Sequence, residues 1–194
     1  KEIDEYKEKF NQQFNTALMG CKLDNINSYY EIVGSYRRGA ETSGDIDLII
    51  TSPDKCIFKK FMDLLIESNI IIEVLSRGHT KSLTITKLDK NSIARRVDFL
   101  YSPPEEYAFA ILYFTGSKEF NTAMRQHALN NNLTLNEHGF HKMINKIKGD
   151  KIVEPVFNTE KDIFDYLNLE FKEPNERIDS NSIIIKKKSS KEEP

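Results

Sequence analysis

The stretch from Gly34 to Thr51, GSYRRGAETSGDIDLIIT, combines residue types that suit phosphate and metal chemistry. Asp45 and Asp47 alternate with apolar residues, so both carboxylates face one side of a predicted strand, roughly 7 Å apart at their Cα atoms. Two such carboxylates repel each other unless a cation lies between them, and Mg²⁺ is a hard cation suited to an all-oxygen site. From the Asp-x-Asp pattern alone, a purely structural interpretation is favoured, with two acids at a solvent-exposed strand end.

Phosphate-binding groups come just before these acids, namely Gly34, Gly39, Ser35, Ser43 and Arg38. The glycines allow a tight turn and a close approach of the backbone to a ligand. The hydroxyl groups and the guanidinium fork can donate to phosphate oxygens. A phosphate cradle beside a metal-binding pair of acids is what phosphoryl or nucleotidyl transfer requires. The alternative for Arg37 and Arg38 is a solvated pair beside acids such as Glu41.

Asp98, in the segment ARRVDFLY, is a candidate third acid for a two-metal site. Arg96 lies two residues earlier on the same strand face, so its guanidinium would favour ionisation of the Asp98 carboxyl and orient it. Taken alone, this pair is more often a structural ion pair. Beside Asp45 and Asp47, Asp98 becomes the third metal ligand and the base for an attacking hydroxyl group.

Length, composition and charge limit the function classes that remain. The 194 residues are enough for one domain with a core or for two small lobes, and 39% hydrophobic and 30% charged residues are typical of a soluble globular protein. No apolar run approaches the roughly 20 residues that span a bilayer, so we expect no membrane partner. The net charge of -2 gives no global attraction to nucleic acid, which would have to bind at local basic patches. We expect Cys21 and Cys56 to be reduced thiols of an intracellular protein.

The predicted secondary structure places the acids in a mixed sheet with packed helices. Amphipathic helices are predicted over 4–19 and 52–68, the second with Ser52 as its cap and Pro53 in its first turn. Strands are predicted over 29–35, 45–51, 69–76, 82–88 and 94–101.

Beyond the break SPPE at 102–105 the pattern becomes helical, and it includes a short hairpin whose turn is predicted in IKGDKI. Asn158 or Thr159 would cap the last helix. Helices are predicted over 105–117, 118–132 and 158–169.

Together these segments resemble the catalytic part of a family X DNA polymerase, with polymerase β as the closest pattern. LYFTGSKEFNTAMRQHAL is similar to the family's nucleotide-sugar and minor-groove segment, and TEKDIFDYLNLEFKEPNER is similar to its C-terminal end. The resemblance runs from near Lys1 to about Arg177. The family's nucleotidyltransferase signature is matched by Gly34-Ser35, Arg38-Gly39, Ser43-Gly44, Asp45-x-Asp47 and Arg96-x-Asp98.

The resemblance implies an α+β fold in two parts. Residues 1–102 would form the palm, a nucleotidyltransferase-type mixed sheet with flanking helices that carries the catalytic acids. Residues 103–176 would form a small helical and hairpin subdomain that contacts the nucleotide and the DNA minor groove. Residues 177–194 would be a polar flexible tail.

The resemblance also implies roles at the metal and phosphate positions. Asp45 and Asp47 would hold two Mg²⁺ ions, for which Mn²⁺ can substitute. Asp98 would bind the catalytic metal and help to activate the primer 3′-hydroxyl, with Arg96 beside it as a further catalytic residue. The triphosphate of the incoming nucleotide would be held by Gly34, Ser35, Arg38, Ser43 and Gly44.

A second set of implied roles concerns the sugar and the base. Tyr113, Phe114 and Gly116 would pack against the nucleotide sugar and favour deoxynucleotides, and a cis peptide bond follows the matching glycine in the family. Asn121 and Arg125 are four residues apart and share one helix face. In the family that face reads the minor groove, where pairing shape can be checked without reading the sequence. The alternative is the ordinary polarity of a helix surface.

Two positions depart from the polymerase β pattern. Lys118 stands where polymerase β has an acidic residue, so contacts to the nucleotide base are expected to differ. Leu100 stands where polymerase β has an arginine that is associated with switching between open and closed forms. Arg125 and Glu137 retain one candidate salt bridge, and we expect a different open-to-closed balance.

The expected function is template-dependent addition of dNMP to a primer 3′-hydroxyl, filling short gaps in base-excision-type repair in the nucleus or another site of DNA repair. We expect a monomer that acts on gapped or primed DNA and dNTP. The segment between Ser76 and Asp98 leaves no room for the long loop of template-independent relatives. Lyase and helix-hairpin-helix domains would precede Lys1, and the sequence leaves their presence in the full-length protein open. The alternatives are an RNA-tailing or small-molecule nucleotidyltransferase and a catalytically weak DNA-binding scaffold.

Overall fold

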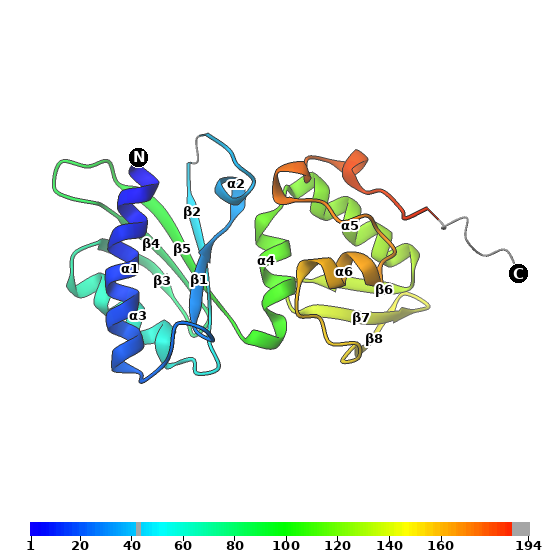
Figure 1. The fold of residues 1–194 in the computed structure, drawn as a ribbon, viewed down its shortest axis with the longest axis horizontal. Coiled ribbons are helices and arrows are strands. Elements are labelled where there is room, and N and C mark those ends of the chain that lie inside the picture. The colour runs from blue at the N-terminus through cyan, green and yellow to red at the C-terminus, as the bar shows by residue number, and fades with distance from the viewer. Residues whose placement is uncertain (42–43, 188–194) are drawn as a thin grey trace, which may run out of the picture. The chain divides into compact units, whose positions relative to one another are not determined.

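The computed structural model describes residues 1–41 and 44–187 of the chain (Figure 1). These residues fold into two compact units. The first comprises Lys1–Tyr36 and the described residues between Ala40 and Pro104, and the second comprises Arg37–Gly39 and residues 105–187. Ser43, one of the predicted triphosphate ligands, lies outside the described residues. Within the described ranges, no helix combines the length and the apolar character that crossing a membrane requires.

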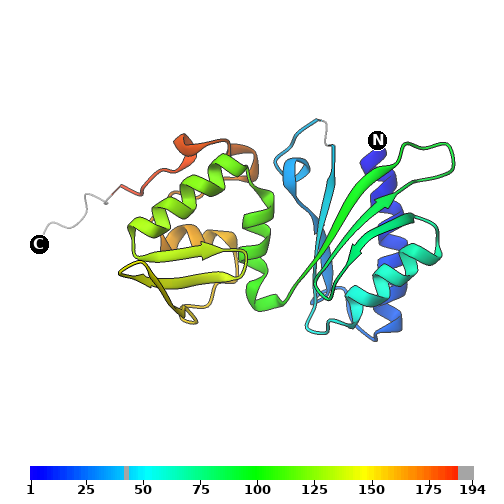
Figure 2. The same cartoon turned by 180° about the vertical axis from the view of Figure 1, so that it is seen from behind.

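A mixed sheet with the strand order β1-β2-β5-β4-β3 forms the centre of the first unit. β2 and β5 are parallel, and the other neighbouring strands are antiparallel. Helices α1 (Glu2–Gly20) and α3 (Cys56–Glu67) cover one face of this sheet, which confirms the predicted α+β class (Figures 1 and 2). The strands are β1 (Tyr29–Ile32), β2 (Ile46–Thr51), β3 (Ile71–Arg77), β4 (Lys81–Thr86) and β5 (Arg95–Ser102).

An aromatic cluster holds the two helices on the sheet. Phe61 of α3 is fully buried, and its ring centroid lies 6.4 Å from that of Phe10 and 5.2 Å from that of Phe14, both on α1. From the sheet, Tyr30 stacks on Phe61 at 6.1 Å and Phe99 meets it edge-on at 5.9 Å. The helical spacing of Phe10 and Phe14 and the strand alternation around Phe99 therefore converge on one buried ring.

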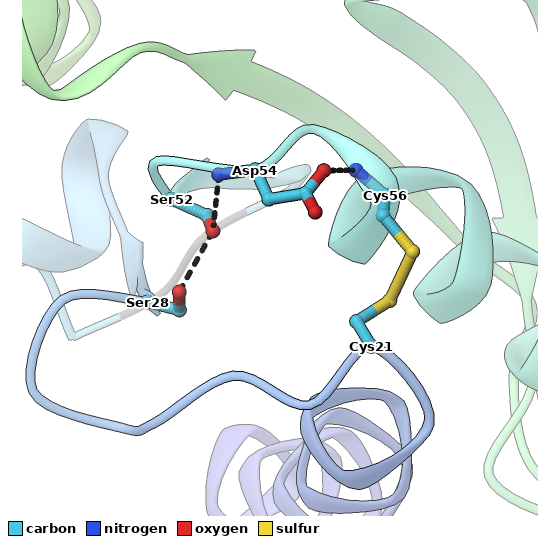
Figure 3. The surroundings of a disulfide bond; sticks show 5 residues. All are labelled: Cys21, Ser28, Ser52, Asp54 and Cys56. Atoms are coloured by element: carbon cyan, nitrogen blue, oxygen red, sulfur yellow. Dashed lines mark hydrogen bonds between the residues drawn. A yellow bond between two sulfur atoms is a disulfide. The ribbon is translucent and has the colours of Figure 1, made fainter.

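The start of α3 differs from the prediction. Ser52 does not cap the helix, which begins at Cys56. The Ser52 hydroxyl is buried, lies 2.7 Å from the Ser28 hydroxyl and accepts a hydrogen bond from the Asp54 backbone N–H at 3.1 Å (Figure 3). Asp54 Oδ1 in turn accepts from the Cys56 N–H at 2.9 Å. Because these side chains bind the backbone of the intervening turn, the helix starts after the turn.

Cys21 and Cys56 form a disulfide, so the expectation of two reduced thiols is wrong (Figure 3). Cys21 follows the last residue of α1, and Cys56 is the first residue of α3. Packing of the two helices brings their Cα atoms to 6.3 Å, within the range that a disulfide spans. The pair is 35 residues apart in sequence, so no local spacing predicts it.

In the described part of the second unit, helices pack with a sheet of strand order β6-β7-β8. Phe120, Phe140 and Phe164 are buried in its core. Thr159 caps the last helix, which confirms one of the two predicted caps: its side chain accepts from the Asp162 N–H, and the Asp162 carboxylate accepts from the Thr159 N–H. The elements are α4 (Tyr107–Thr115), α5 (Lys118–Asn130), β6 (Leu133–Asn136), β7 (Gly139–Ile144), β8 (Ile147–Lys151) and α6 (Glu160–Tyr166).

The prediction of a turn in IKGDKI is wrong, because Ile147–Lys151 form β8. The chain reverses instead at Asn145 and Lys146, whose φ values of 50° and 63° lie in the left-handed region. The type I′ turn of a two-residue hairpin needs this conformation at both central positions. Asparagine adopts it readily, whereas lysine gives no such signal in the sequence.

The segment after Pro174 is more ordered than the predicted flexible tail. Arg177 is 1% exposed, and Leu169 and Ile185 form an antiparallel bridge. Lys186 Nζ lies 2.5 Å from Asp165 Oδ1. The prediction is therefore corrected for residues 177–187, and residues 188–194 lie outside the described part of the chain.

We predict that Phe61→Ala lowers the free energy of unfolding of the first unit by about 3–5 kcal/mol, because the cavity removes contacts to both helices and to the sheet. Denaturant unfolding followed by circular dichroism measures this effect, since the sequence contains no tryptophan. Met19 is 75% exposed on α1, so Met19→Ala is the control and should change stability by less than about 0.5 kcal/mol. Equal losses in the two variants would contradict the proposed role of Phe61.

Candidate active site

Asp47 and Asp98 lie side by side because β2 and β5 run parallel and in register. The two acids are partners in this register, and the register pairs on either side of them are buried apolar residues. Alternation along each strand directs the acids to the sheet face opposite these apolar neighbours. Both acids are half-buried. The structure thus brings together two of the three acids singled out in the sequence.

This arrangement raises the pKa of Asp47 above its ordinary value of 3.8. Burial is the largest cause, followed by the negative charges of Asp98 and Asp45, and the positive charges of Lys81 and Arg96 oppose it. A raised pKa is expected of carboxylates gathered in one place, because each disfavours the ionised form of the other. A divalent cation between them would remove this repulsion, and their oxygen donors suit a hard cation such as Mg²⁺.

Arg96 orients Asp98. Its Nε donates to Asp98 Oδ1 at 3.0 Å, as the strand spacing of the two residues predicts. The two side chains are 41% and 21% exposed, so the ion pair contributes little to stability. Its effect is to hold one carboxylate oxygen of Asp98 in a defined position.

Gly34 allows the chain to turn close to Asp47. Its φ of 67° lies in the left-handed region, and a Cβ at this position would lie 3.3 Å from Asp47 Oδ2. The preceding Val33 N–H donates to the Asp47 backbone oxygen at 2.9 Å, so the turn begins directly at the strand pair. Gly34 then opens the short helix α2 (Gly34–Arg37), which contains the half-buried Ser35.

Gly44 and Asp45 lie just before β2 and are exposed. Asp45 is near enough for its charge to raise the pKa of Asp47. Over residues 1–41 and 44–187, however, no group of three or more His, Cys, Asp or Glu side chains is arranged to hold a metal ion. The structure therefore places Asp47 with Asp98 and does not complete a three-acid group with Asp45.

In the second unit, Arg37 is bound to Glu160. The Arg37 guanidinium donates to both carboxylate oxygens of Glu160, at 2.6 and 3.0 Å, and to Thr115 Oγ1 at 2.8 Å. Arg177, whose side chain is fully buried, donates to Glu160 Oε2 at 2.5 Å. Burial would raise the pKa of Glu160, but the hydrogen bond from Arg37 and the charge of Arg177 outweigh it and hold this pKa below its ordinary value.

Arg38 lies against the backbone at Gly116. Its Nη1 donates to the Thr115 backbone oxygen at 2.7 Å. A Cβ at Gly116, where φ is 72°, would lie 3.0 Å from the same nitrogen, so glycine makes room for the guanidinium. The Gly116–Ser117 peptide bond is cis, as the family resemblance implies. A predicted phosphate ligand and a predicted sugar contact are thus neighbours.

Tyr113 joins the other predicted sugar and minor-groove residues. Its backbone oxygen accepts from Asn121 Nδ2 at 2.7 Å, and the Arg125 guanidinium lies 5.9 Å from the centre of its ring. Phe114 packs edge-on against Tyr113 with the ring centroids 5.0 Å apart. These four residues form one cluster within the second unit.

The candidate salt bridge between Arg125 and Glu137 is not formed among the described residues. Arg125 Nε donates weakly to the Asn121 backbone oxygen at 3.4 Å. The Glu137 carboxylate lies 3.6 Å from His138 Nε2.

Glu160 is the residue that sequence reasoning misses. It follows Thr159 at the start of a predicted helix, where an acid is expected for its favourable interaction with the helix dipole. Its partner Arg37 lies 123 residues away, and no local pattern marks such a pair. Thr115, which also binds Arg37, gives no signal because it lies within an apolar helical run.

We predict that Asp47→Asn stabilises the metal-free protein at neutral pH, as a rise in melting temperature. A carboxyl whose folded pKa is raised destabilises the fold once pH exceeds its unfolded pKa, and the penalty is complete above the folded pKa. The gain should therefore shrink as pH falls and vanish below about 3.8.

Asp24→Asn is the matched control for this effect. Backbone hydrogen bonds from Asn27 and Ile26 lower the pKa of Asp24, so its removal should destabilise the protein at neutral pH. Thermal unfolding in a chelating buffer across the acid range measures both variants. A lower melting temperature for Asp47→Asn at neutral pH would contradict the charge crowding described for Asp47.

We further predict that Glu160→Gln destabilises the second unit by roughly 3–5 kcal/mol, because it leaves Arg177 buried without a counter-charge. Asp63→Asn is the control, since Asp63 and Arg77 form an exposed pair 2.7 Å apart that should contribute no more than about 1 kcal/mol. Denaturant unfolding measures both variants. Similar small losses would show that the Glu160 cluster is not a buried ion network.

Comparison with known proteins matches both units. Residues 7–104 match the family model described as the DNA polymerase beta palm, and residues 110–178 match that of the DNA polymerase beta thumb. The chain is 36% identical over 159 residues to DNA polymerase lambda of Rattus norvegicus, covering 74% of this chain and 28% of that protein.

Two further relatives agree with this match. DNA polymerase lambda of Arabidopsis thaliana is 30% identical over 162 residues, covering 74% of this chain and 31% of that protein. DNA nucleotidylexotransferase of Gallus gallus is 30% identical over 180 residues, covering 75% of this chain and 35% of that protein. The chain spans about a third of the length of these curated relatives. Because the palm model alone covers half of its residues, the chain belongs to the polymerase β-type, or family X, DNA polymerases.

Proposed function

We propose that this chain is the catalytic part of a template-dependent DNA polymerase that adds dNMP to a primer 3′-hydroxyl and fills short gaps in base-excision-type repair. The observation that carries the proposal is the register pairing of Asp47 with Asp98, with Arg96 bound to Asp98, in a chain of this family. Half-buried carboxylates in adjacent strands, with a raised pKa at one of them, are costly for the fold and suit a site that receives cations.

Two Mg²⁺ ions, or Mn²⁺ in their place, would be held by Asp45, Asp47 and Asp98. When bound, such ions supply positive charge to the triphosphate and to the attacking and leaving oxygens. The fit rests on the donor set, since Asp47 and Asp98 present adjacent carboxylate oxygens whose mutual repulsion a cation would relieve.

The chain's own groups would bind and orient the substrates. We assign to Asp98 the acceptance of the proton from the primer 3′-hydroxyl, because the Arg96 hydrogen bond fixes the position of its carboxylate. The triphosphate would be bound by side-chain hydrogen-bond donors and by flexible glycine backbone. These residues are Gly34, Ser35, Arg38, Ser43 and Gly44.

The remaining nucleotide contacts belong to the cluster on α4 and α5. Tyr113, Phe114 and Gly116 would pack against the sugar and exclude a 2′-hydroxyl. Asn121 uses one amide hydrogen on the Tyr113 backbone, so the side chain is held in place to present its other polar atoms to the minor groove. Arg125 is exposed beside it and would contact the same groove on the template side.

We assign metal binding to a palm over residues 1–102 and nucleotide contacts to the subdomain over residues 103–176. The substrates would be gapped or primed DNA and dNTP, and the protein would act as a monomer within the cell, in the nucleus or at another site of DNA repair. Residues 78–80 connect β3 to β4, and this short turn supports a template-dependent rather than a template-independent enzyme. Upstream lyase and helix-hairpin-helix domains would be partners in a longer protein.

We predict that the chain extends a primer across a one-nucleotide gap only with the complementary deoxynucleotide and only when Mg²⁺ or Mn²⁺ is present. Asp98→Ala should lower the rate by about a hundredfold or more, because it removes a group that contacts the reacting atoms. Asp150→Asn removes an equal charge from the exposed strand β8 and should leave the rate unchanged. Single-turnover incorporation on gapped, nicked and open templates is the measurement.

Each alternative function has a distinct outcome in this assay. Addition of nucleotides without regard to the template, or a preference for ribonucleotides, would favour a tailing nucleotidyltransferase. DNA binding without metal-dependent extension, or full extension by Asp98→Ala, would favour a non-catalytic DNA-binding role.

A further inference from the structure

The first unit contains a pocket of about 580 Å³ beside the disulfide. It lies between the first turns of α3 and the turn that connects β3 to β4, and it shares no residue with the candidate active site. Its apolar wall includes Phe58, and an exposed sulfur-bearing residue, Cys56, lines it directly. The basic side chains among its lining residues are Lys55, Lys59, Arg77 and His79.

The pocket carries a surplus of positive charge. Arg77 is neutralised by Asp63, whose Oδ1 lies 2.7 Å from Arg77 Nη2. Lys55 Nζ lies over the Tyr101 ring, 5.7 Å from the centre of the ring. Over the described ranges, no carboxylate forms an ion pair with Lys55 or Lys59. A small anion is therefore the ligand that the charges favour.

The two cysteine residues differ in exposure. Cys56 is exposed and lines the pocket, whereas Cys21 is half-buried at the end of α1 and is not among the lining residues. Figure 3 shows the disulfide between the end of α1 and the beginning of α3. A nucleophile held in the pocket would therefore meet Cys56 Sγ first, with Cys21 as the leaving group.

We propose that this pocket binds a small anionic thiol, of the glutathione type, which opens the Cys21–Cys56 disulfide by exchange. The bound thiolate attacks Cys56 Sγ, a new S–S bond forms to that sulfur, and the Cys21–Cys56 bond breaks with its electron pair leaving on Cys21 as a thiolate. A second thiolate then attacks the sulfur of the bound thiol, releasing the small-molecule disulfide and the Cys56 thiolate. The protein disulfide is reduced by two electrons, and the two small thiols are oxidised.

The positive pocket favours this reaction because its charges concentrate an anionic thiolate near Cys56. Opening the disulfide removes the cross-link between α1 and α3. The unfolded chain then gains conformational freedom that the cross-link had removed. The first unit therefore becomes less stable in its reduced form, and its stability depends on the thiol state of its surroundings.

The test compares three thiols of similar size on the intact, oxidised protein: 2-mercaptoethanesulfonate, 2-mercaptoethanol and cysteamine, which are anionic, neutral and cationic. Rates of disulfide opening are expressed per thiolate. The anionic thiol should exceed the cationic one by on the order of tenfold at low salt, and the difference should largely vanish at about 1 M salt. Acid quenching and mass spectrometry should locate the first adduct on Cys56.

A double variant, Lys55→Gln with Lys59→Gln, should remove most of the preference for the anionic thiol. Lys90→Gln is the matched control, because Lys90 is exposed and outside the pocket, and it should retain the preference. The melting temperature of the reduced protein should be below that of the oxidised protein. Equal rates per thiolate for the three probes, a first adduct on Cys21, or a protein that keeps two free thiols under oxidising conditions would each overturn the proposal.

Discussion

The parallel pairing of β2 with β5 is the constraint on which the candidate site depends. It sets Asp47 opposite Asp98. The neighbouring register partners Leu48 and Phe99 are fully buried, so a shift of one residue in this register would expose the core and bury the acids. The hydrophobic core therefore fixes the geometry of the carboxylates, and the fold accepts their mutual repulsion.

In the second unit, a buried ion pair likewise fixes the position of a neighbouring residue, Arg38. Arg38 faces the backbone before Gly116, while its neighbour Arg37 is held by Glu160 and Thr115. A buried ion network of this kind is weak evidence for stability, because desolvation offsets much of its attraction. Its value lies in fixing where the segment Arg37–Gly39 runs, so that the guanidinium of Arg38 is presented in one arrangement.

Much of this arrangement can be predicted from local sequence patterns. The strand periodicity around Asp47 and Asp98 and the Arg96 spacing predict the acids' shared face, and Thr159 is recognisable as a cap. The misses share one physical cause, which is contact between distant segments. The Glu160 partner of Arg37, the disulfide of Cys21 with Cys56 and the binding of Ser52 to Ser28 all depend on tertiary packing. Family resemblance supplies residue roles, but it does not reveal the pairing with Glu160.

The central claim is that Asp47 and Asp98 share one electrostatic environment that a divalent cation is suited to neutralise. The most direct measurement is a carboxyl-carbon NMR titration of Asp47, without metal, with Mg²⁺, and in Asp98→Asn. The account predicts a pKa above the ordinary value of 3.8 without metal, and a lower pKa with Mg²⁺ or when Asp98 loses its charge. A pKa of Asp47 at its ordinary value that neither Mg²⁺ nor Asp98→Asn changes would contradict it.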